Sequence, residues 1–338
     1  MTKARTNASA SPAVGRNMII NGAMNVAQRS ASVTGIGSAA GYFTCDRWYV
    51  TMGSTAGRFT MTQTADGPNG ISANCLKMDC TTADTSIASG EYLVLQQKIE
   101  GQNLQRIGKG VAGAKQFTVS FYVKASAAFT FGLELEDSDN GRTITKLFDT
   151  TTDWVRHSFV IPADADDGSS PFDDDNAASL LVNFWLHAGS SFAGGTLNTA
   201  TFVNTTNANR AAGIDSFFSS TDNNFFITGV QMEVGPVATE FEQEDISTTL
   251  AKCQRYCYFL AVGGNEVIVQ YQGSYRCMKV GHPVTMRAAP TFAVGTFSNF
   301  SAFGGSNSTT TSLYAYVAKE FDDTNSLTVV NVKFESEL

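Results

Sequence analysis

The stretch KQFTVSFYVKAS, residues 115–126, alternates apolar and polar side chains more regularly than any other part of the chain. Alternation places successive side chains on opposite faces of a strand. One face would carry Phe117, Val119, Phe121 and Val123, and the other Thr118, Ser120, Tyr122 and Lys124. A strand with one apolar and one polar face is typical of an antiparallel sheet that covers a core on one side. The stretch therefore predicts such a strand, with its Phe and Val side chains buried.

Shorter segments of the same kind recur on both sides of this stretch. They are GRFTMTQT (57–64), EYLVLQQKIEG (91–101), FTFGLELED (129–137), DWVRHSFVIP (153–162), LLVNFWLHAG (180–189) and FFITGVQMEVGP (225–236). Turn residues separate them, and a helical period is almost absent. Many short strands between turns favour an all-β fold, and we predict a jelly-roll β-sandwich.

One segment, EDISTTLAKCQRYCYFL (244–260), has a helical period instead. Its apolar side chains recur at helical spacing at Ile246, Leu250, Cys253 and Cys257. Asp245 or Ser247 could cap a helix over about 247–258. Strand-like segments follow it. We expect three parts: an N-terminal arm (1–16), the jelly-roll β-sandwich (17–246), and a short linking helix with a small C-terminal β-domain (247–338).

Composition excludes several function classes. The 338 residues carry a net charge of -8, and charged residues make up 16% against roughly 25% in an average soluble protein. Neither a basic nucleic-acid footprint nor an apolar run of about 20 residues for membrane insertion is present. The N-terminus lacks the apolar core of a secretory signal, so we expect synthesis and folding in a cytoplasm. The six cysteines are expected to be free structural thiols.

The sequence offers no catalytic constellation. It lacks the GxSxG, HExxH and phosphate-loop motifs, and its three histidines stand apart. Glu134, Glu136 and Asp137 form an acidic group, and paired carboxylates can hydrolyse a glycan. Alternation puts Glu134 and Glu136 on one strand face, which we interpret as solvated. We therefore expect that the protein is not an enzyme.

An acidic loop, ADADDGSSPFDDDNAAS, lies between two of the predicted strands. Oxygen ligands suit calcium, although the spacing here matches no EF-hand. The alternative is a loop that is simply solvated. No cofactor is predicted, but a structural calcium ion could be held by Asp164, Asp166, Asp167, Asp173, Asp174 and Asp175.

Several motifs in the same order resemble the tail-fibre and related virion proteins of tailed phages. They are GRNMIINGAMNVAQRS (15–30) with YFTCDRWYV (42–50), ITGVQMEVGPVATEFEQEDISTTLAKCQRYCYFL (227–260), HPVTMRAAPTF (282–292) and the closing ESEL (335–338). The segments FTVSFYVKAS, TTDWVRHSFVI and FFITGVQMEVG are similar to jelly-roll carbohydrate-binding modules.

The resemblance implies a virion structural protein, a tail-fibre or appendage subunit that attaches to a host cell-surface glycan. It implies a homotrimer, located on the tail or particle surface, which contacts other virion proteins through the N-terminal arm. One alternative is a capsid decoration or head-fibre protein with a purely architectural role, and a second is a glycan depolymerase.

Glycan binding would need aromatic rings that stack on pyranoses, with polar groups nearby. By parity, Tyr122, Trp185 and His187 point away from the Phe side chains of their strands, which makes them candidate glycan-binding residues. Trp185 could instead pack against another protomer or domain.

The residues of the opening stretch RNMIINGAMNVAQRS (16–30) indicate a structural role rather than a binding site. Asn21 and Gly22 form a turn signal. Arg29, Asp46 and Arg47 could make a buried charge-assisted contact that fixes the first strand. We interpret this region as a structural clasp.

Overall fold

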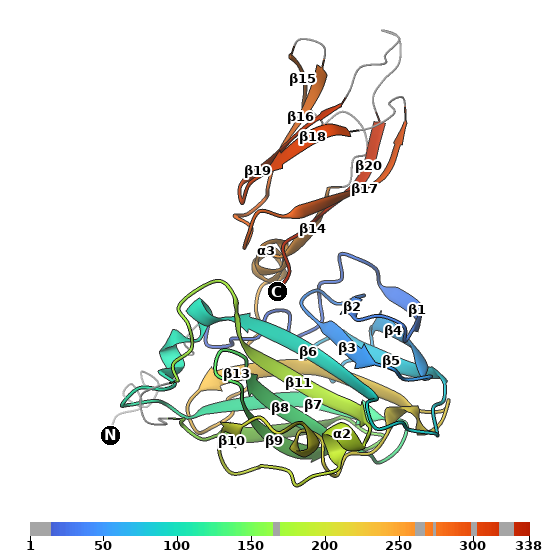
Figure 1. Ribbon diagram of the computed structural model, residues 1–338, viewed down its shortest axis with the longest axis vertical. Coiled ribbons are helices and arrows are strands. Elements are labelled where there is room, and N and C mark those ends of the chain that lie inside the picture. The colour runs from blue at the N-terminus through green and yellow to red at the C-terminus, as the bar shows by residue number, and fades with distance from the viewer. Residues whose placement is uncertain (1–14, 165–169, 261–267, 273–274, 299–302, 318–327) are drawn as a thin grey trace.

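The computed structural model describes residues 15–164, 170–260, 268–272, 275–298, 303–317 and 328–338. Two large antiparallel sheets form a β-sandwich, and two smaller sheets follow near the C-terminus (Figure 1). The predicted all-β class is confirmed. Of the predicted arm, only Gly15 and Arg16 belong to the described residues, and the two boundaries between the three predicted parts stay predictions.

One layer of the sandwich is a six-stranded sheet. Its strands, in spatial order, are β1 (Ser32–Ile36), β4 (Arg58–Thr64), β5 (Cys75–Thr82), β13 (Asn224–Val234), β7 (Phe117–Ala125) and β10 (Val155–Ile161). The decisive stretch therefore forms β7, next to the edge strand β10. The pairs β10–β7 and β13–β7 are antiparallel, as the alternation predicted.

The other layer is a seven-stranded sheet. Its strands, in spatial order, are β12 (Val203–Asn204), β9 (Arg142–Asp149), β8 (Thr130–Asp137), β11 (Ala178–Ala188), β6 (Tyr92–Glu100), β3 (Tyr49–Gly53) and β2 (Gly41–Tyr42). The long strands β8, β11 and β6 lie side by side at its centre, which makes this part of the sheet a rigid platform.

The core lies between the two sheets. Phe117, Val119, Phe121 and Val123 of β7 are all buried there, so the predicted inner face is confirmed. Phe121 packs edge-on against Phe184 of the opposite sheet, with ring centroids 5.0 Å apart. Edge-to-face packing is the favourable arrangement for such rings. These contacts fix which side of each strand faces outward.

Short helical turns connect the strands. They are η1 (Gly101–Asn103), η2 (Gln105–Ile107), α2 (Ser190–Ala193), η3 (Asn207–Asn209) and η4 (Phe217–Ser219). The chain between β11 and η4, residues 189–216, contains α2, β12 and η3, and we call it the strap. It is held together by main-chain bonds such as Ala211 N to Phe192 O (2.9 Å).

Helix α3 (Ile246–Gln254) links the sandwich to the C-terminal part. Asp245 caps it by accepting a 2.8 Å hydrogen bond from Ser247 N, as the sequence allowed. The helix is shorter than predicted, because the chain turns after Arg255 and Cys257 opens a strand. Ile246 is 53% exposed, so the prediction that it belongs to a buried apolar face of this helix is wrong.

The C-terminal strands form one three-stranded and one four-stranded sheet. The first contains, in order, β14 (Cys257–Leu260), β20 (Thr328–Glu335) and β17 (Thr291–Ser298). The second contains β15 (Ile268–Gln272), β16 (Tyr275–Gly281), β19 (Ser312–Val317) and β18 (Phe303–Ser308). Figure 1 shows both sheets standing away from the sandwich, while the last residues return to the junction beside α3.

The opening stretch forms the predicted turn. Asn21 has a φ of 56°, a left-handed conformation that Asn tolerates. Its side-chain amide holds the turn by donating to Val26 O (2.8 Å) and accepting from Val26 N (3.0 Å). Gly22 is required because a Cβ there would lie 2.1 Å from Val230 O. Met24 is then fully buried in the core.

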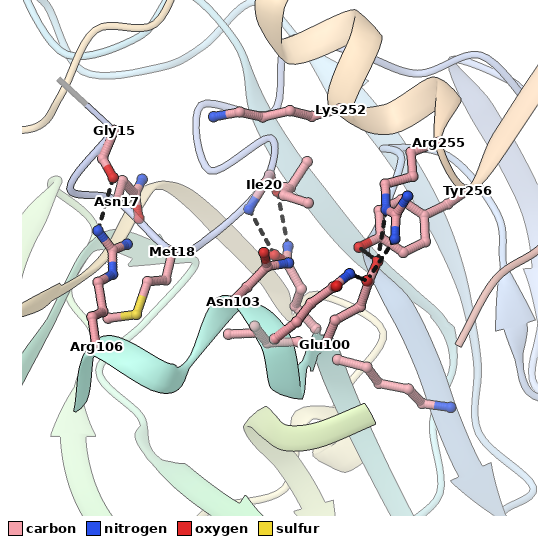
Figure 2. Close-up of a pocket in the computed structure, with 14 residues that line it drawn as sticks. Gly15, Asn17, Met18, Ile20, Glu100, Asn103, Arg106, Lys252, Arg255 and Tyr256 are labelled. Carbon is pink, nitrogen blue, oxygen red and sulfur yellow. Dashed lines mark hydrogen bonds and ion pairs between the residues drawn. The ribbon is translucent and has the colours of Figure 1, made fainter. Parts of the chain in front are cut away.

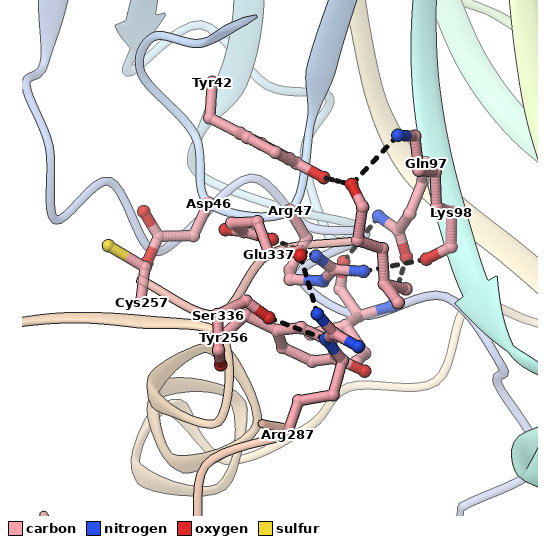
Figure 3. A network of polar contacts seen from close by, with 12 residues as sticks. Tyr42, Asp46, Arg47, Gln97, Lys98, Tyr256, Cys257, Arg287, Ser336 and Glu337 are labelled. Carbon is pink, nitrogen blue, oxygen red and sulfur yellow. Dashed lines mark hydrogen bonds and ion pairs between the residues drawn. The ribbon is translucent and has the colours of Figure 1, made fainter. Parts of the chain in front are cut away.

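The C-terminal residues are locked onto the opening segment by three arginines, and we call Arg29, Arg47, Arg287 and residues 335–337 the C-terminal clasp. Arg29 Nη2 lies 2.9 Å from both Glu335 and Glu337, and Arg47 pairs with Glu337. Arg287 donates to Ser336 O (2.6 Å) and Glu337 O (2.9 Å). Figure 3 shows Arg47 and Arg287 close to Ser336 and Glu337.

The clasp interpretation is supported, but its partners differ from the predicted ones. Arg29 Nη1 does lie 3.6 Å from Asp46, whereas its shorter contacts are to the C-terminal carboxylates. Arg47 is buried and stacks on Tyr256, with 3.5 Å from its guanidinium carbon to the ring centroid. Burial raises the pKa of Asp46, although Gln28 and Arg29 oppose the shift. These contacts tie residues far apart in sequence into one structural unit.

Five cysteines of the described part of the chain, Cys45, Cys75, Cys80, Cys253 and Cys257, are free and buried, as expected. Burial raises the pKa of Cys75 to about 11. Among the described residues, no helix is long and apolar enough to cross a membrane.

Candidate functional site

The three predicted glycan-binding residues do not share one site. Tyr122 lies on β7 in the six-stranded sheet, whereas Trp185 and His187 lie on β11 in the seven-stranded sheet. All three do alternate with core residues as predicted. Tyr122 is half-buried, and the guanidinium carbon of Arg156 lies 5.7 Å from its ring centroid. The three residues therefore cannot contribute to one site, because their strands belong to opposite layers.

Trp185 points outward from its sheet, but it is only 2% exposed. The strap covers it: Phe192 and Ala211 pack with Trp185 and Val94 in a small apolar cluster on the outer face. Figure 1 shows α2 beside the end of β11. The prediction of an exposed stacking ring at Trp185 is therefore wrong, and the reason is the strap's own chain rather than a second protomer.

His187 is likewise covered and fully buried. Its Nδ1 lies 2.8 Å from Ser216 Oγ, and its Nε2 lies 3.4 Å from Glu91 Oε2. Phe218 packs edge-on against the imidazole, with 5.3 Å between centroids. Burial lowers the pKa of His187, while Glu91 and Asp84 oppose the shift. His187 is therefore wrong as a glycan-contacting residue.

A groove opens beside the covered tryptophan, on the outer face of the seven-stranded sheet. Its volume is about 230 Å³, and we call it the β6–β11 groove. It is lined by Thr51, Tyr92, Val94, Gln96, Glu136, Asn183, Trp185, Phe192 and Arg210. Most of these side chains stand on β3, β6, β8 and β11, where the core residues of each strand fix the outward parity. Rigid strands therefore position the groove floor.

The aromatic part of the groove consists of three rings in mutual contact. Tyr92 and Phe192 are half-buried, with ring centroids 5.1 Å apart. Trp185 lies beneath them, 6.2 Å from Tyr92 and 5.5 Å from Phe192. Gly53 leaves room for Tyr92, because a Cβ there would lie 2.4 Å from its ring. Tyr92 and Phe192 are thus the rings that can meet a ligand.

The polar part is a network around two carboxylates. Glu134 is fully buried and accepts from Trp185 Nε1 (2.8 Å), Asn183 Nδ2 (2.9 Å) and Arg210 Nε (2.7 Å). Glu136 is 22% exposed and also pairs with Arg210. Burial alone would lower the pKa of Arg210, but hydrogen bonds and charge from both carboxylates raise it above its ordinary value.

These contacts correct the interpretation of Glu134 and Glu136 as a solvated strand face. They share a face, as alternation predicted, but the strap brings Arg210 over them. The third member of the acidic group, Asp137, is fully buried, and its Oδ2 lies 2.6 Å from Lys109 Nζ. All three carboxylates therefore have cationic partners.

The predicted calcium loop is also organised by cations of the protein. Lys109 Nζ lies 2.6 Å from Asp137, 3.3 Å from Asp164 and 2.7 Å from Ser170 O. Arg142 pairs with the other oxygen of Asp164 at 3.1 Å. The ammonium group of Lys109 thus supplies positive charge to these three oxygen atoms.

The other described aspartates of the loop do not join that cluster around Lys109. Asp173, Asp174 and Asp175 are exposed, and Asp175 bonds locally to Ala177 N (2.8 Å). Asp166 and Asp167 lie outside the described residues. Within the described part of the chain, no three His, Cys, Asp or Glu side chains gather to hold a metal ion. The four described members therefore do not form a metal site among themselves, and the full set with Asp166 and Asp167 stays a prediction.

A second cavity, of about 710 Å³, lies at the junction between the sandwich and α3 (Figure 2). Four cations line it, Lys98, Arg106, Lys252 and Arg255, together with Glu100. Arg255 makes a two-point contact with Glu100 (3.0 and 2.8 Å), and Arg106 binds the main-chain oxygens of Gly15 and Arg16 (2.9 Å each). Its charged groups thus hold α3 and the opening segment onto the sandwich.

Sequence reasoning missed Tyr92, Phe192 and Arg210. Tyr92 is followed by the apolar run Leu93, Val94 and Leu95, which does not alternate and so does not reveal that Tyr92 faces outward. Phe192 is one of only two aromatic residues in the Gly/Thr/Asn-rich strap, and Arg210 is the only charged residue between 189 and 214. An isolated charge in such a neutral segment is a usable signal, because it needs a partner elsewhere.

The sequence matches no protein-family model and no curated protein. Several solved structures resemble it at low identity. The enzymatically active domain of bacteriophage CBA120 tailspike protein 4 is 11% identical, with a TM-score of 0.33. That match covers 65% of this chain and 22% of the tailspike chain.

Two further similar structures carry the descriptions "CBM4 structure and function" and TmCBM61 in complex with β-1,4-galactotriose. Both are 12% identical, with TM-scores of 0.33 and 0.32. The first match covers 64% of this chain and 98% of the other, and the second 65% and 100%. Likenesses this distant concern the fold alone.

Proposed function

We propose that this protein binds a glycan in the β6–β11 groove. The observation that carries the proposal is the meeting of two half-buried rings with polar side chains. Tyr92, Gln96 and Glu136 stand on the strands of the sheet, and the strap adds Phe192 and Arg210. Pyranose rings present an apolar face and a rim of hydroxyl groups. A concave site with aromatic walls and a few fixed polar groups is suited to both.

Binding is proposed without hydrolysis. Glycoside hydrolysis ordinarily uses two carboxyl groups that flank the scissile bond. Glu136 lines the groove, but Glu134 is buried beneath the tryptophan and accepts a hydrogen bond from it. One carboxylate is therefore left to meet a ligand. Release of reducing sugar from any bound glycan would contradict this part of the proposal.

The experiment that tests the site compares Tyr92→Ala with Phe226→Ala. Phe226 is a half-buried ring on the outer face of the opposite sheet, so it controls for the loss of an aromatic surface side chain. On a glycan array followed by titration calorimetry, Tyr92→Ala should weaken binding by about 1 kcal/mol, roughly fivefold. Phe226→Ala should bind like the wild type. Equal behaviour of the two variants would remove the groove from the proposal.

We further propose that the glycan belongs to a bacterial surface and that the protein is a tail-fibre or appendage subunit of a tailed phage, assembled as a homotrimer. The order of the motifs quoted above supports this, and weak sites would gain from avidity in a trimer. Light scattering of the purified protein tests the oligomer. Cryo-electron microscopy of the whole particle tests the location and the contact made by residues 1–16.

One observation favours the architectural alternative, a capsid decoration or head-fibre protein. Residues of the resembling motifs, among them Arg29, Arg47, Arg287 and Glu337, gather in the C-terminal clasp rather than in the groove. The resembling motifs therefore indicate a structural framework shared with those virion proteins more than a shared ligand. Particles that carry the Tyr92→Ala subunit separate the two functions: adsorption to cells falls if the groove binds the host, and is unchanged if the role is architectural.

A further inference from the structure

The charged groups of the β6–β11 groove suggest which glycans it accepts. Two carboxylates, Glu134 and Glu136, face a single guanidinium, that of Arg210. Arg210 is the only cation among the described residues that line the groove. Its charge is shared between both carboxylates, so the groove keeps a net negative charge. Because the site is partly shielded from water, that charge acts more strongly on a ligand than it would in bulk solvent.

The acceptor atoms of the groove that have no partner in the protein also favour an uncharged sugar. The contacts of Glu136 with Arg210 and Asn183 use Oε2, and Oε1 accepts no hydrogen bond from the described residues, which leaves an acceptor available in the groove. Gln96 uses its Nε2 on Asn183 Oδ1 (2.7 Å), which leaves its carbonyl oxygen as a second acceptor. A sugar hydroxyl can donate to such atoms, whereas an ionised carboxylate can only accept.

The same groove also offers donors. Neither the Tyr92 hydroxyl nor Arg210 Nη1 makes a hydrogen bond to the described residues, so both can donate to a ligand. A hydroxyl group both donates and accepts, so one uncharged pyranose can satisfy the acceptors and the donors together. The carboxylate of an acidic sugar could satisfy the donors but not the acceptors, and it would place a further negative charge beside Glu136.

We propose that the β6–β11 groove selects uncharged sugars and that Glu136 is the residue that rejects carboxylated ones. This inference rests on the proposed glycan-binding function and deepens it. The proposal gives Glu136 direct contact with the ligand. Glu134 is a positioning residue, because it holds Arg210 and Trp185 in place.

The test uses matched pairs of oligosaccharides that differ only at C6: oligogalactosides against oligogalacturonides, and oligoglucosides against oligoglucuronides, of equal length. The wild type should bind the neutral member of a pair at least tenfold more tightly than the acidic member. Glu136→Gln keeps the shape and the acceptor oxygen but removes the charge. It should reduce that ratio to about threefold or less.

The matched control is Glu240→Gln, which removes an exposed carboxylate outside the groove and should leave the ratio unchanged. Salt gives a second measurement that needs no variant. Added sodium chloride should strengthen wild-type binding of the acidic member, because it screens repulsion between exposed charges.

Three outcomes would overturn the proposal. Preference of the wild type for the acidic member would reverse it. An unchanged ratio in Glu136→Gln, with binding retained, would remove Glu136 as the selecting residue. Failure of the wild type to bind either member of any pair would instead contradict the glycan-binding function itself, and so is distinct from a failure of selectivity.

Discussion

The indole Nε1 of Trp185 donates a 2.8 Å hydrogen bond to Glu134 Oε2, and both side chains are buried. The tryptophan thus satisfies a carboxylate that would otherwise lose a bond inside the protein. This pairing makes Trp185 a structural residue beneath the β6–β11 groove rather than the ring that a ligand touches.

We therefore expect Trp185→Ala to lower the free energy of unfolding by about 3–5 kcal/mol, the usual cost of deleting a large buried aromatic side chain. Trp185→Phe keeps much of the ring but leaves Glu134 short of a donor, which should cost about 1–3 kcal/mol. Urea unfolding measures both. A Trp185→Ala protein of wild-type stability that had lost glycan binding would show that the ring itself contacts the ligand.

The sequence predicted the position of some of these side chains in the fold and not of others. Alternation around 115–126 and 180–189 correctly placed Phe121 and Phe184 in the core and Trp185 on the outer face. It could not show that Trp185 is covered, because the strap has no period of its own. The strap is fixed by distant contacts such as Arg210 with Glu134, and a single sequence does not reveal such pairings.

The same limit explains the clasp. A buried role for Arg29 and Arg47 was predictable from their place among strand-forming residues. Their main partners, Glu335 and Glu337, lie about three hundred residues further on, and only the return of the last strand to the junction brings them near. Local patterns therefore predicted the need for partner charges and missed their identity.

The clasp gives the second prediction. Arg47→Met removes one of the two arginines that pair with Glu337 at a buried site, and breaking a buried ion pair on one side costs about 3–5 kcal/mol. We expect the C-terminal sheets to detach from the sandwich before the sandwich itself unfolds. Limited proteolysis would then cleave near α3 in the variant and not in the wild type. Lys77→Met, at a half-exposed surface pair, is the control and should behave as wild type.

Lys109 gives the third prediction. Its ammonium lies among Asp137, Asp164 and a main-chain oxygen, so Lys109→Met would leave two buried carboxylates with less compensation. A loss of about 3–5 kcal/mol in unfolding free energy is expected. Because this lysine already supplies the positive charge, the melting temperature of the wild type should not change with EDTA or with added calcium. A large calcium-dependent rise in melting temperature would contradict this assignment.

His187 gives the last prediction, the pH dependence of stability. Burial lowers its pKa in the folded protein, whereas the unfolded chain takes up the proton near the ordinary value of about 6.5. Between these two pKa values the unfolded state binds more protons, so the free energy of unfolding rises with pH. The contribution of neutral His187 is complete above about pH 6.5 and is lost as the pH falls toward the folded value.

Two variants distinguish the contribution of His187 to this pH dependence from those of other titrating groups. One such group is His282, whose pKa is also lowered by burial. His187→Gln should flatten the rise in urea-unfolding free energy between about pH 5 and 7. Glu91→Gln should widen the pH range of that rise, because Glu91 is a carboxylate that raises the pKa of His187 against the effect of burial. If His187→Gln kept the wild-type slope, the acid sensitivity would belong to another group, and the buried imidazole would have only a packing role against Phe218.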